Sequence, residues 1–390
     1  MRKGWEYKKL GEICSSDLGK TLNKSKDVGN MRPYLCAINI LWDSIDLTTL
    51  KEACFKDDEI DRYTVKYGDL LVCEGGDTGR AAIWDRKEPI LYQNALHRLR
   101  FKEDVDARFI MYNLWHKKQI GEIDHKYSKG VTILHLVKSA LLSIPILLPP
   151  LSTQLAIVSE LDKINELIRL KKEQLKDFDN LAQSLFYEMF GDPVENEKGW
   201  KVKKLGDICA DITDGDHMPP PKSEFGIPFI TISDIDKDTR CLNFENTFYV
   251  PEDYYNNLKE NRKPQKGDLL YTVTGSYGIP VIVKTDKKFC FQRHIALLRP
   301  NKEILSTIFL CYWVLSDGVK FMADKVATGI AQKTVGLNSI RKFSCILPPL
   351  SLQRLFAQRI EQIEREKSEV QKSILDLETL LASRMQYWFE

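Results

Sequence analysis

Residues 4–14 read Gly-Trp-Glu-Tyr-Lys-Lys-Leu-Gly-Glu-Ile-Cys, and residues 199–209 read Gly-Trp-Lys-Val-Lys-Lys-Leu-Gly-Asp-Ile-Cys. The Pro-Pro-Leu-Ser-x-Gln of residues 149–154 likewise returns at residues 348–353. Ordered matches at a nearly constant spacing of 195 to 199 residues indicate an internal duplication, and such a repeat decides the fold. Between these two motifs the matches are Gly68–Leu71 with Gly267–Leu270, Gln93 with Gln292, and Gly130 with Gly329.

The composition is that of a globular protein. Of the 390 residues, 43% are hydrophobic and 29% are charged, which excludes a disordered or fibrous chain and allows two ordinary domains. No segment approaches the roughly 20 apolar residues of a membrane helix, and no apolar run follows the charged N-terminus as in a signal peptide. We therefore expect a cytoplasmic protein without a membrane partner.

The nine cysteines include no Cys-x-x-Cys pair and no cluster with histidine at metal-ligand spacing. We expect mostly buried free thiols and no metal. The net charge of +2 by itself argues weakly against a strong nucleic-acid binder, but the distribution of charge along the chain is more permissive. Residues 1–150 carry +3 and residues 199–349 carry +4, whereas residues 151–198 carry −4 and residues 350–390 carry −1.

Each copy has the same order of parts, which predicts an α+β fold. Short strand-like runs come first, separated by Gly and Asp turns, and a helical segment follows at residues 107–118 or 306–323. An apolar run then leads to Pro-Pro, after which Ser152 or Ser351 can cap a new helix. The predicted domains are two globular modules, each followed by a helical segment, at residues 1–150, 151–198, 199–349 and 350–390.

The helix after each Pro-Pro carries a heptad pattern. Apolar residues recur every seven positions in two interleaved series, as in helices that pair in a coiled coil. Lys171 and Lys367 interrupt the series at places where the other copy has Val370 and Ile168, which favours two unlike helices packing on each other. The residues predicted to pair the helices are Leu161, Ile164, Ile168, Leu175, Phe178, Leu185, Ile360, Ile363, Val370, Ile374, Leu377 and Leu381.

This order predicts a pseudo-two-fold molecule. The first helix leads from module one to module two through Gly191-Asp192-Pro193, and the second can return antiparallel to it. The two modules would then be held at opposite ends of a helical rod. Such an arrangement can present two readers to one DNA duplex.

We find none of the sequence motifs of catalysis that we considered. A phosphate-binding loop would need glycine where Cys14 stands before Lys20-Thr21, and the Pro-Pro pairs do not follow Asp or Asn as in amino-methyltransferases. No dinucleotide fingerprint, nucleophile elbow or zinc-protease motif is present. The six histidines are isolated, which is more typical of structural than of catalytic histidines.

These motifs together resemble the specificity (S) subunits of type I restriction–modification systems, the HsdS family. The resemblance rests on the repeated Gly-Trp opening, on Gly-Asp-Leu-Leu, on Leu-Pro-Pro-Leu-x-x-Gln, and on the Leu-Phe-Tyr-Glu-Met-Phe-Gly-Asp-Pro of residues 185–193. It covers essentially the whole chain. The second long helix departs from the pattern because no Phe-Gly-Asp-Pro follows it.

The resemblance implies a division of labour between subunits. Each globular copy would be a target recognition domain that reads one half of a bipartite, asymmetric double-stranded DNA target. The helices would set the distance between the half-sites and dock modification subunits, two in number, with restriction subunits joining them. The specificity subunit would be non-catalytic, and S-adenosylmethionine, ATP and magnesium would belong to the partner subunits.

The candidate DNA contacts lie in loops that differ between the copies, because a repeated scaffold that reads two sequences should keep its frame and vary its loops. These loops carry Arg, Lys, Asn, Gln and Thr, which contact phosphates and base edges, beside glycines that allow close approach. Ordinary solvated turns would also have this composition. The candidates are Lys20, Asn23, Lys24, Lys26, Thr78, Arg80, Asn94, Lys129, Thr132, His217, Lys222, Thr274, Ser276, Tyr277, Arg293, Gln332, Lys333 and Thr334.

Three other interpretations stay open at this point. The chain could be the specificity part of a fused enzyme, whose catalytic motifs would lie in adjoining sequence. It could serve a system that only methylates, or it could be a coiled-coil scaffold whose globular parts bind protein. Salt-sensitive binding to duplex DNA separates a DNA reader from a protein scaffold.

Overall fold

The chain forms two compact units. Unit 1 comprises residues 1–172 and 372–390, and unit 2 comprises residues 173–371. Each unit therefore contains one globular module and parts of both long helices. The computed structural model describes residues 4–23, 27–130, 134–217, 219–329 and 332–390.

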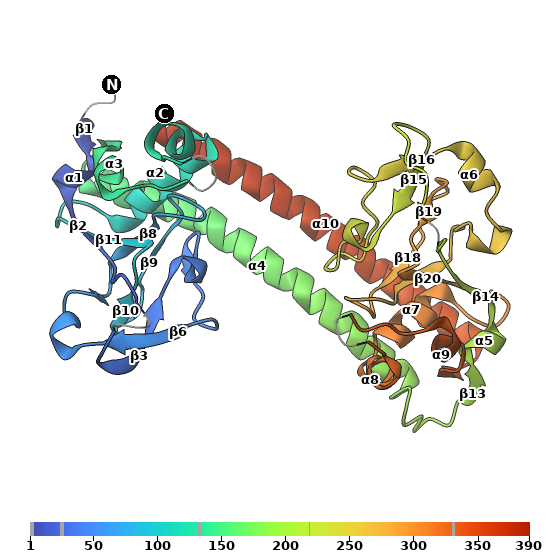
Figure 1. The fold of residues 1–390 in the computed structure, drawn as a ribbon. Coiled ribbons are helices and arrows are strands. Elements are labelled where there is room, and N and C mark those ends of the chain that lie inside the picture. Colours follow the sequence, from blue (N-terminus) through green and yellow to red (C-terminus); the bar gives the residue numbers. More distant parts are fainter. Residues whose placement is uncertain (1–3, 24–26, 131–133, 218, 330–331) are drawn as a thin grey trace. The chain divides into compact units, whose positions relative to one another are not determined.

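The elements of unit 1 follow the order predicted for the first repeat (Figure 1). Its strands are β1 Glu6–Lys9, β2 Cys14–Leu18, β3 Asn30–Leu35, β4 Ile40–Leu41, β5 Ser44–Ile45, β6 Lys51–Phe55, β7 Thr64–Val65, β8 Leu70–Cys73, β9 Ala81–Ile83, β10 Ile90–Tyr92, β11 Leu96–Phe101 and β12 Pro145–Leu148. Its helices are α1 Leu10–Ile13, α2 Ala107–Gln119, α3 Lys138–Ser143, the 3-10 turns Ala37–Asn39 and Asp57–Glu59, and the π-helical turn Ile123–Tyr127.

Unit 2 repeats this series with small differences. Its strands are β13 Lys201–Lys204, β14 Cys209–Asp214, β15 Ile227–Ile230, β16 Phe248–Val250, β17 Leu269–Thr272, β18 Pro280–Ile282, β19 Cys290–Phe291, β20 Ile295–Pro300 and β21 Ser344–Leu347. Its helices are α5 Leu205–Ile208, α6 Glu252–Asn256, α7 Thr307–Leu315, α8 Asp317–Val326, α9 Leu337–Arg341 and the 3-10 turns Ile232–Asp234 and Glu260–Arg262. The long helices are α4 Leu151–Phe190 and α10 Leu350–Phe389.

The main sheets of the two units share one strand order, although the second sheet has four strands in unit 1 and three in unit 2. An antiparallel sheet has the order β2-β11-β8-β9 in unit 1 and β14-β20-β17-β18 in unit 2. A second sheet has the order β6-β3-β10-β7 or β16-β15-β19, and in it β3 pairs with β10, and β15 with β19, in parallel. The duplicated α+β fold predicted from the repeats is thus confirmed.

The repeated Gly-Trp motif forms the strand that closes each module. In unit 1, β1 pairs antiparallel with β12, directly before Pro-Pro, and in unit 2 β13 pairs in the same way with β21. Leu10 and Leu205 follow these strands and are fully buried. At Gly11 an added Cβ would lie 3.2 Å from Leu142, and at Gly206 it would lie 3.3 Å from Arg341, so each glycine allows close packing.

The repeated Gly-Asp-Leu-Leu motif forms a turn held by an ion pair. Gly68 and Gly267 adopt positive φ of 84° and 94°, a conformation that glycine favours. The following Asp69 accepts two hydrogen bonds from the Arg100 guanidinium, both of 2.7 Å. In unit 2, Asp268 accepts the corresponding bonds from Arg299 at 3.0 and 2.8 Å. The motif therefore joins two neighbouring strands.

The repeated glutamine after Pro-Pro joins the long helix to its module. Gln154 is fully buried and accepts a hydrogen bond from the backbone N–H of Asp106. Its amide donates to the carbonyls of Asp104 and Pro149. Gln353 makes the same three bonds in unit 2. A buried amide with its bonding capacity used in this way fixes where the helix begins.

The two long helices pair antiparallel within each unit. In unit 1, Glu160 of α4 bonds to Arg384 and to Trp388 of α10, and Lys172 lies 2.7 Å from Glu378. The order of these contacts shows the antiparallel direction and confirms that prediction. All twelve residues predicted to pair the helices are buried or half-buried.

One helical segment differs from its prediction. The single helix expected over residues 306–323 is divided at Ser316 into α7 and α8. Ser316 is extended and donates its hydroxyl to the carbonyl of Trp313 at 2.7 Å. Gly318 then packs closely on Val194, where an added Cβ would approach to 2.5 Å.

Candidate nucleic-acid interface

Three chain segments meet at one end of the antiparallel sheet in unit 1. The N–H of Leu136 donates to the carbonyl of Glu74 at 2.7 Å, and the N–H of Glu74 donates to Ala95 at 2.9 Å. Lys129 and His135 exchange two backbone hydrogen bonds of 2.9 and 2.8 Å. The first loop cluster, as we name it, consists of these three segments, residues 74–80, 93–95 and 128–130 with 134–136, and of a fourth, residues 19–23, in which Lys20 forms a β-bridge with Gln93.

The corresponding segments meet in unit 2 through the same kinds of bond. The N–H of Val335 donates to Val273, and the N–H of Val273 donates to His294, both at 2.9 Å. Thr328 and Thr334 exchange two backbone bonds of 3.0 and 2.8 Å. The structure therefore brings together the loops that the sequence had singled out separately, except for Lys222, whose ammonium group lies over the Phe248 ring, 5.1 Å from its centroid. The second loop cluster consists of residues 214–217, 273–279, 292–294, 328–329 and 332–335.

The candidate side chains differ in their exposure to solvent. A side chain must be accessible to contact a phosphate or a base edge, so exposure divides the candidates into groups. The exposed candidates are Asn23, Lys129, His217, Lys222, Ser276, Arg293, Gln332 and Lys333; the half-buried ones are Arg80, Asn94, Tyr277 and Thr334; the buried ones are Lys20, Thr78 and Thr274. Lys24, Lys26 and Thr132 lie outside the described residues.

Lys20 has a structural environment. Its ammonium group lies 2.7 Å from Glu59 and 3.7 Å from Asp27, and it also donates to the carbonyl of Cys54 at 3.0 Å. Burial alone would lower the pKa of Lys20, but the hydrogen bond and charge of Glu59 raise it above its ordinary value. Lys20 is thus a buried cation whose donors are used within unit 1.

Arg80 and Asn94 hold the shape of the first loop cluster. The Arg80 guanidinium donates to the carbonyl of Ala37 at 2.9 Å and lies 3.7 Å from Asp77. Asn94 donates to Thr21 at 3.2 Å, and its side-chain oxygen accepts from the N–H of Ala95. Ala95 has a positive φ of 87°, which is strained for a residue with a Cβ, so these contacts maintain a costly turn.

Tyr277, Thr274 and Thr334 also bond within the protein. The Tyr277 hydroxyl donates to Asp324 at 2.5 Å, and that bond raises the pKa of the phenol. The Thr334 hydroxyl donates to that of Thr274 at 3.2 Å. These three residues shape the second loop cluster, while its exposed neighbours Gln332 and Lys333 are accessible to a ligand.

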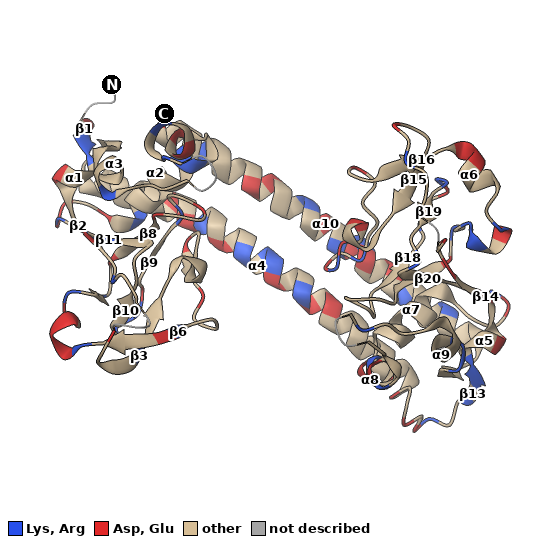
Figure 2. Cartoon of the chain, in the orientation of Figure 1, with Lys and Arg blue, Asp and Glu red and all other residues tan. Residues whose placement is uncertain are grey.

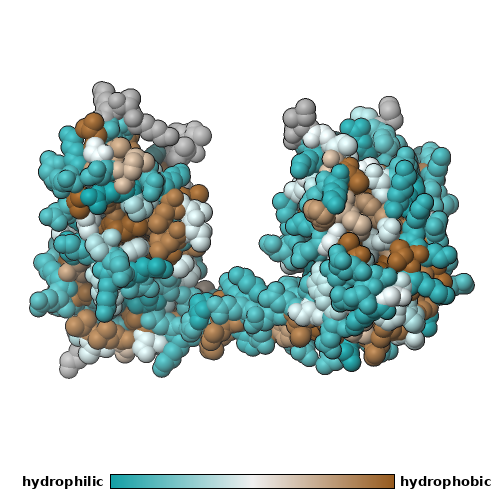
Figure 3. Space-filling view, turned by 90° about the horizontal axis from the view of Figure 1, so that it is seen from below, coloured by the Kyte–Doolittle hydropathy of each residue, from teal (hydrophilic) through white to brown (hydrophobic). Residues whose placement is uncertain are grey.

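The structure adds an exposed apolar residue in each unit that sequence reasoning missed. Val28 is 62% exposed and Phe225 is 81% exposed. Each stands directly before a glycine of positive φ, Gly29 or Gly226, at which an added Cβ would approach a backbone carbonyl to 2.1 or 2.3 Å. Their positions before equivalent glycines were the available signal. Figure 3 shows apolar residues exposed among hydrophilic ones on the surface of each unit.

The described part of the chain offers neither a metal site nor a membrane-spanning helix. No three His, Cys, Asp or Glu side chains there come together in a way that could hold a metal ion. No described helix is both long and apolar enough to span a bilayer.

Comparison with known proteins agrees with this architecture. Residues 2–177 and 197–378 each match the family model described as "Type I restriction modification DNA specificity domain". A putative type I restriction enzyme MjaX specificity subunit of Methanocaldococcus jannaschii is 24% identical, with 97% of this chain and 92% of that protein covered. The type I restriction enzyme EcoBI specificity subunit of Escherichia coli is 24% identical, with 80% of this chain and 70% of that protein covered.

Solved structures share the fold. A chain from a study of complex assembly and conformational transition of the type I R-M system superposes with a TM-score of 0.61 at 19% identity, covering 99% of this chain and 97% of that one. The S subunit from M. genitalium gives a TM-score of 0.51 at 14% identity, covering 99% and 96%. Because the family model matches both repeats and most of the sequence, the chain belongs to the type I restriction–modification specificity subunit family.

Proposed function

We propose that this chain is the DNA-recognition subunit of a type I restriction–modification complex and that each unit reads one half of a bipartite, asymmetric target. One observation carries the proposal. The same backbone bonds assemble a loop cluster in both units, while the exposed side chains on the two clusters differ. A shared frame with different exposed side chains is what two readers of different sequences require.

The exposed residues have the chemistry of DNA contacts. Lys129 in the first cluster and Arg293 and Lys333 in the second can bind phosphates, and Gln332 can bond to a base edge. Figure 2 shows that lysine and arginine residues are distributed over both units, in keeping with the modest positive charge of the two modules. We place Lys20, Thr78, Arg80 and Thr274 in the supporting frame because their side chains bond within the protein.

The chemistry of modification and cleavage falls to other subunits in this proposal. The chain would be non-catalytic, and two modification subunits would supply S-adenosylmethionine while restriction subunits would supply the chemistry that depends on ATP and magnesium. Because its target would be chromosomal or invading DNA, its place of action would be the cytoplasm.

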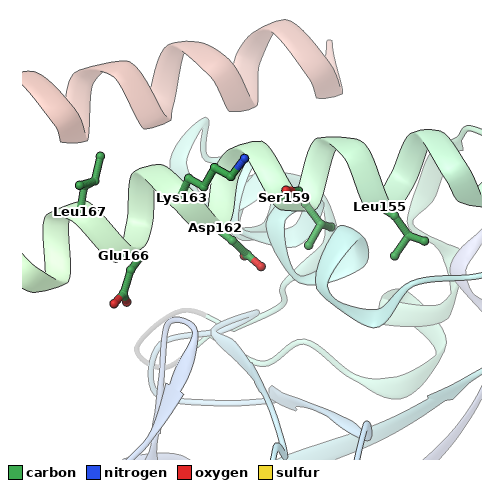
Figure 4. A pocket seen from close by; sticks show the side chains of 7 residues that line it. Leu155, Ser159, Asp162, Lys163, Glu166 and Leu167 are labelled. Atoms are coloured by element: carbon green, nitrogen blue, oxygen red, sulfur yellow. The ribbon is translucent and has the colours of Figure 1, made fainter.

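The long helices are the surface that we propose for docking the modification subunits. In unit 1 one face of α4 lines an open, largely apolar groove of about 720 Å³ (Figure 4). Leu155 and Leu167 lie at its two ends and are about half exposed, and Asp162, Lys163 and Glu166 lie between them. An apolar groove with charged residues between its ends fits a protein partner better than a nucleic acid.

The decisive experiment is methylome sequencing of a host that expresses this chain with its modification subunit. We expect methylated adenine in a two-part motif that disappears when the chain is deleted. Exchange of residues 1–150 should change one half of the motif, and a heptad inserted into both α4 and α10 should change only the spacer. Methylation at a motif without two halves would contradict the proposal.

A binding experiment tests the loop clusters. Lys129→Ala and Lys333→Ala should each weaken binding to the target duplex and reduce the salt slope by about 0.9 for each phosphate that the variant no longer binds. The matched controls are Lys102→Ala and Lys302→Ala, exposed lysines that follow β11 and β20 at the strand ends away from the clusters. If the controls weaken binding as much as the cluster variants, the clusters are not the interface. Absence of salt-sensitive DNA binding by the wild-type complex would favour the protein scaffold instead.

A further inference from the structure

The β8–β9 loop of unit 1, residues 74–80, is held by a network around Lys118 near the end of α2. The Lys118 ammonium lies 2.9 Å from the Oδ1 of Asp77 and 2.7 Å from the Oδ1 of Asp124. The Thr78 hydroxyl donates to the same oxygen of Asp124 at 2.8 Å. One cation therefore joins the loop to α2 and to the π-helical turn that follows it.

The loop rests directly on that turn. Thr78 is 1% exposed. Gly79 has a positive φ of 82°, and a Cβ added there would lie only 2.8 Å from the Ile123 side chain. Burial opposes ionisation of Asp124, but the hydrogen bonds from Lys118 and Thr78 hold its pKa below the ordinary value. Lys118 also has a pKa above its ordinary value, because its bonds to the two carboxylates outweigh burial. Both groups thus stay charged at neutral pH.

The first two residues of the same loop, Glu74 and Gly75, contact the other segments of the first loop cluster. Glu74 bonds to Leu136 and to Ala95, and Gly75 forms a β-bridge with His135. Exposed Lys129 bonds to His135 in turn. A shift of the loop away from Lys118 would therefore displace the segments that we propose to contact DNA.

Unit 2 holds the corresponding β17–β18 loop by different chemistry. Tyr277 stands at the place of Thr78 and donates to Asp324 of α8, so the hydroxyl–carboxylate bond is kept, whereas Asp317 stands at the place of Lys118. The Thr272 hydroxyl closes the loop by donating to the carbonyl of Ser276 at 2.8 Å and accepting from the N–H of Ile279 at 3.0 Å. The two loops thus have equivalent places and separate anchors, so each anchor can be removed alone.

We propose that Lys118 is a positioning residue for sequence recognition by unit 1: it fixes the β8–β9 loop and so sets discrimination at one half-site without contacting DNA. The inference rests on the proposed function. Its physical reason is that base discrimination requires bonding groups to be held within a few tenths of an ångström, whereas phosphate attraction tolerates displacement. Loss of the anchor should therefore reduce specificity more than nonspecific affinity.

The test uses the full chain with its modification subunit and the target found by methylome sequencing. Binding is measured to the target duplex, to a duplex with one base pair changed in the half-site assigned to residues 1–150, and to one changed in the other half-site. For Lys118→Met we expect discrimination at the first half-site to fall about tenfold, as when a single base pair is no longer read. Discrimination at the second half-site and the salt slope should not change.

Two further variants distinguish positioning from a general loss of structure. Lys118→Arg keeps a cation that can bond to both carboxylates, so it should retain most of the discrimination. Tyr277→Phe removes the anchor in unit 2 and should reduce discrimination only at the second half-site.

Three results would overturn the inference. A reduced salt slope with discrimination intact would make Lys118 a phosphate contact, and unchanged discrimination would deny it any role. Equal losses at both half-sites would indicate general destabilisation. A wild-type complex that yields no two-part motif would instead refute the proposed function, before any variant is compared.

Discussion

The two units share the pairing of their main-sheet strands but differ in the side chains that pack between those strands. His97 of unit 1 pairs across the sheet with Val72, and the equivalent residues of unit 2 are Ala296 and Tyr271. A large side chain on one strand and a small one on its neighbour have thus changed places while the register is kept. Core volume can be redistributed in this way at little cost as long as the total is maintained.

The hairpins that follow β3 and β15 also carry different residues, and here the sign of the charge differs between the units. In unit 1, Asp43 accepts hydrogen bonds from Arg108 and from Asn165 of α4. In unit 2 the corresponding hairpin carries Arg240, which donates to Asp179 of α4 at 3.1 Å. Both hairpin residues have a positive φ, 59° and 53°. The hairpin stays attached to the helices although the sign of its charge is reversed.

The largest expected difference between the units concerns the repeated Asp–Arg pair. Asp268→Ala should lower the free energy of unfolding of unit 2 by about 2–4 kcal/mol, because it removes the bonded partner of half-buried Arg299 and leaves only Asp211, 3.9 Å away, as a counter-ion. Asp69→Ala should cost unit 1 less, about 1–2 kcal/mol, because the Arg100 side chain is 43% exposed and can be hydrated, whereas Arg299 is 16% exposed. Hydrogen exchange of the strand amides measures each unit separately.

The control for this comparison is a lysine at either arginine. Arg100→Lys and Arg299→Lys keep the charge and lose the paired geometry, so both should have smaller effects than removal of the aspartate. Equal losses of stability in the two aspartate variants would show that exposure of the arginine does not govern the cost.

The frame could be predicted from sequence because it repeats. The offset that relates Gly68 to Gly267 also relates Asp69 to Asp268 and Arg100 to Arg299, so the ion pair was detectable as a repeat of two charges. The buried glutamine after each Pro-Pro, Gln154 or Gln353, was detectable as a repeat in the same way. These residues bond to backbone or to a buried charge, and such contacts tolerate few substitutions.

The loop clusters could be predicted only in part. The loops could be identified from the sequence, but the bonds of Arg80 to Ala37 and of Tyr277 to Asp324 could not. Those contacts join residues more than 40 positions apart, and although the Tyr277–Asp324 bond corresponds to the Thr78–Asp124 bond of unit 1, the donor residue differs between the copies. A long-range side-chain contact whose residue types are not repeated leaves no signal in the sequence.

The helix pair offers the second comparison. In unit 2 the Lys367 ammonium, 12% exposed, lies 2.8 Å from Asp179 of α4, whereas in unit 1 Lys172 and Glu378 are each about half exposed. Asp179→Ala should destabilise unit 2 by about 1–2 kcal/mol, because it removes the partner of both Lys367 and Arg240. Glu378→Ala should cost unit 1 less than about 0.5 kcal/mol, because an exposed ion pair contributes little. Hydrogen exchange of the helix amides, measured over a range of urea concentrations, would show which of the two variants is less stable. A larger loss for Glu378→Ala than for Asp179→Ala would contradict the argument from burial.

The smallest expected effect depends on pH and falls on unit 1. His97 is fully buried, its ring nitrogen donates to the carbonyl of Leu136 at 2.9 Å, and burial lowers its pKa below the ordinary 6.5. As the pH falls through 6.5, the unfolded chain binds a proton at this histidine before the folded chain does. The free energy of unfolding of unit 1 is therefore higher above pH 6.5 than below it. His97→Gln cannot be protonated there, so the stability difference between wild type and variant should narrow between about pH 7.5 and 5.5. Ala296 occupies the equivalent place in unit 2, so hydrogen exchange of the amides in that unit should show no change of this difference with pH. If the difference in unit 1 also does not change with pH, His97 has the same pKa in the folded and unfolded states.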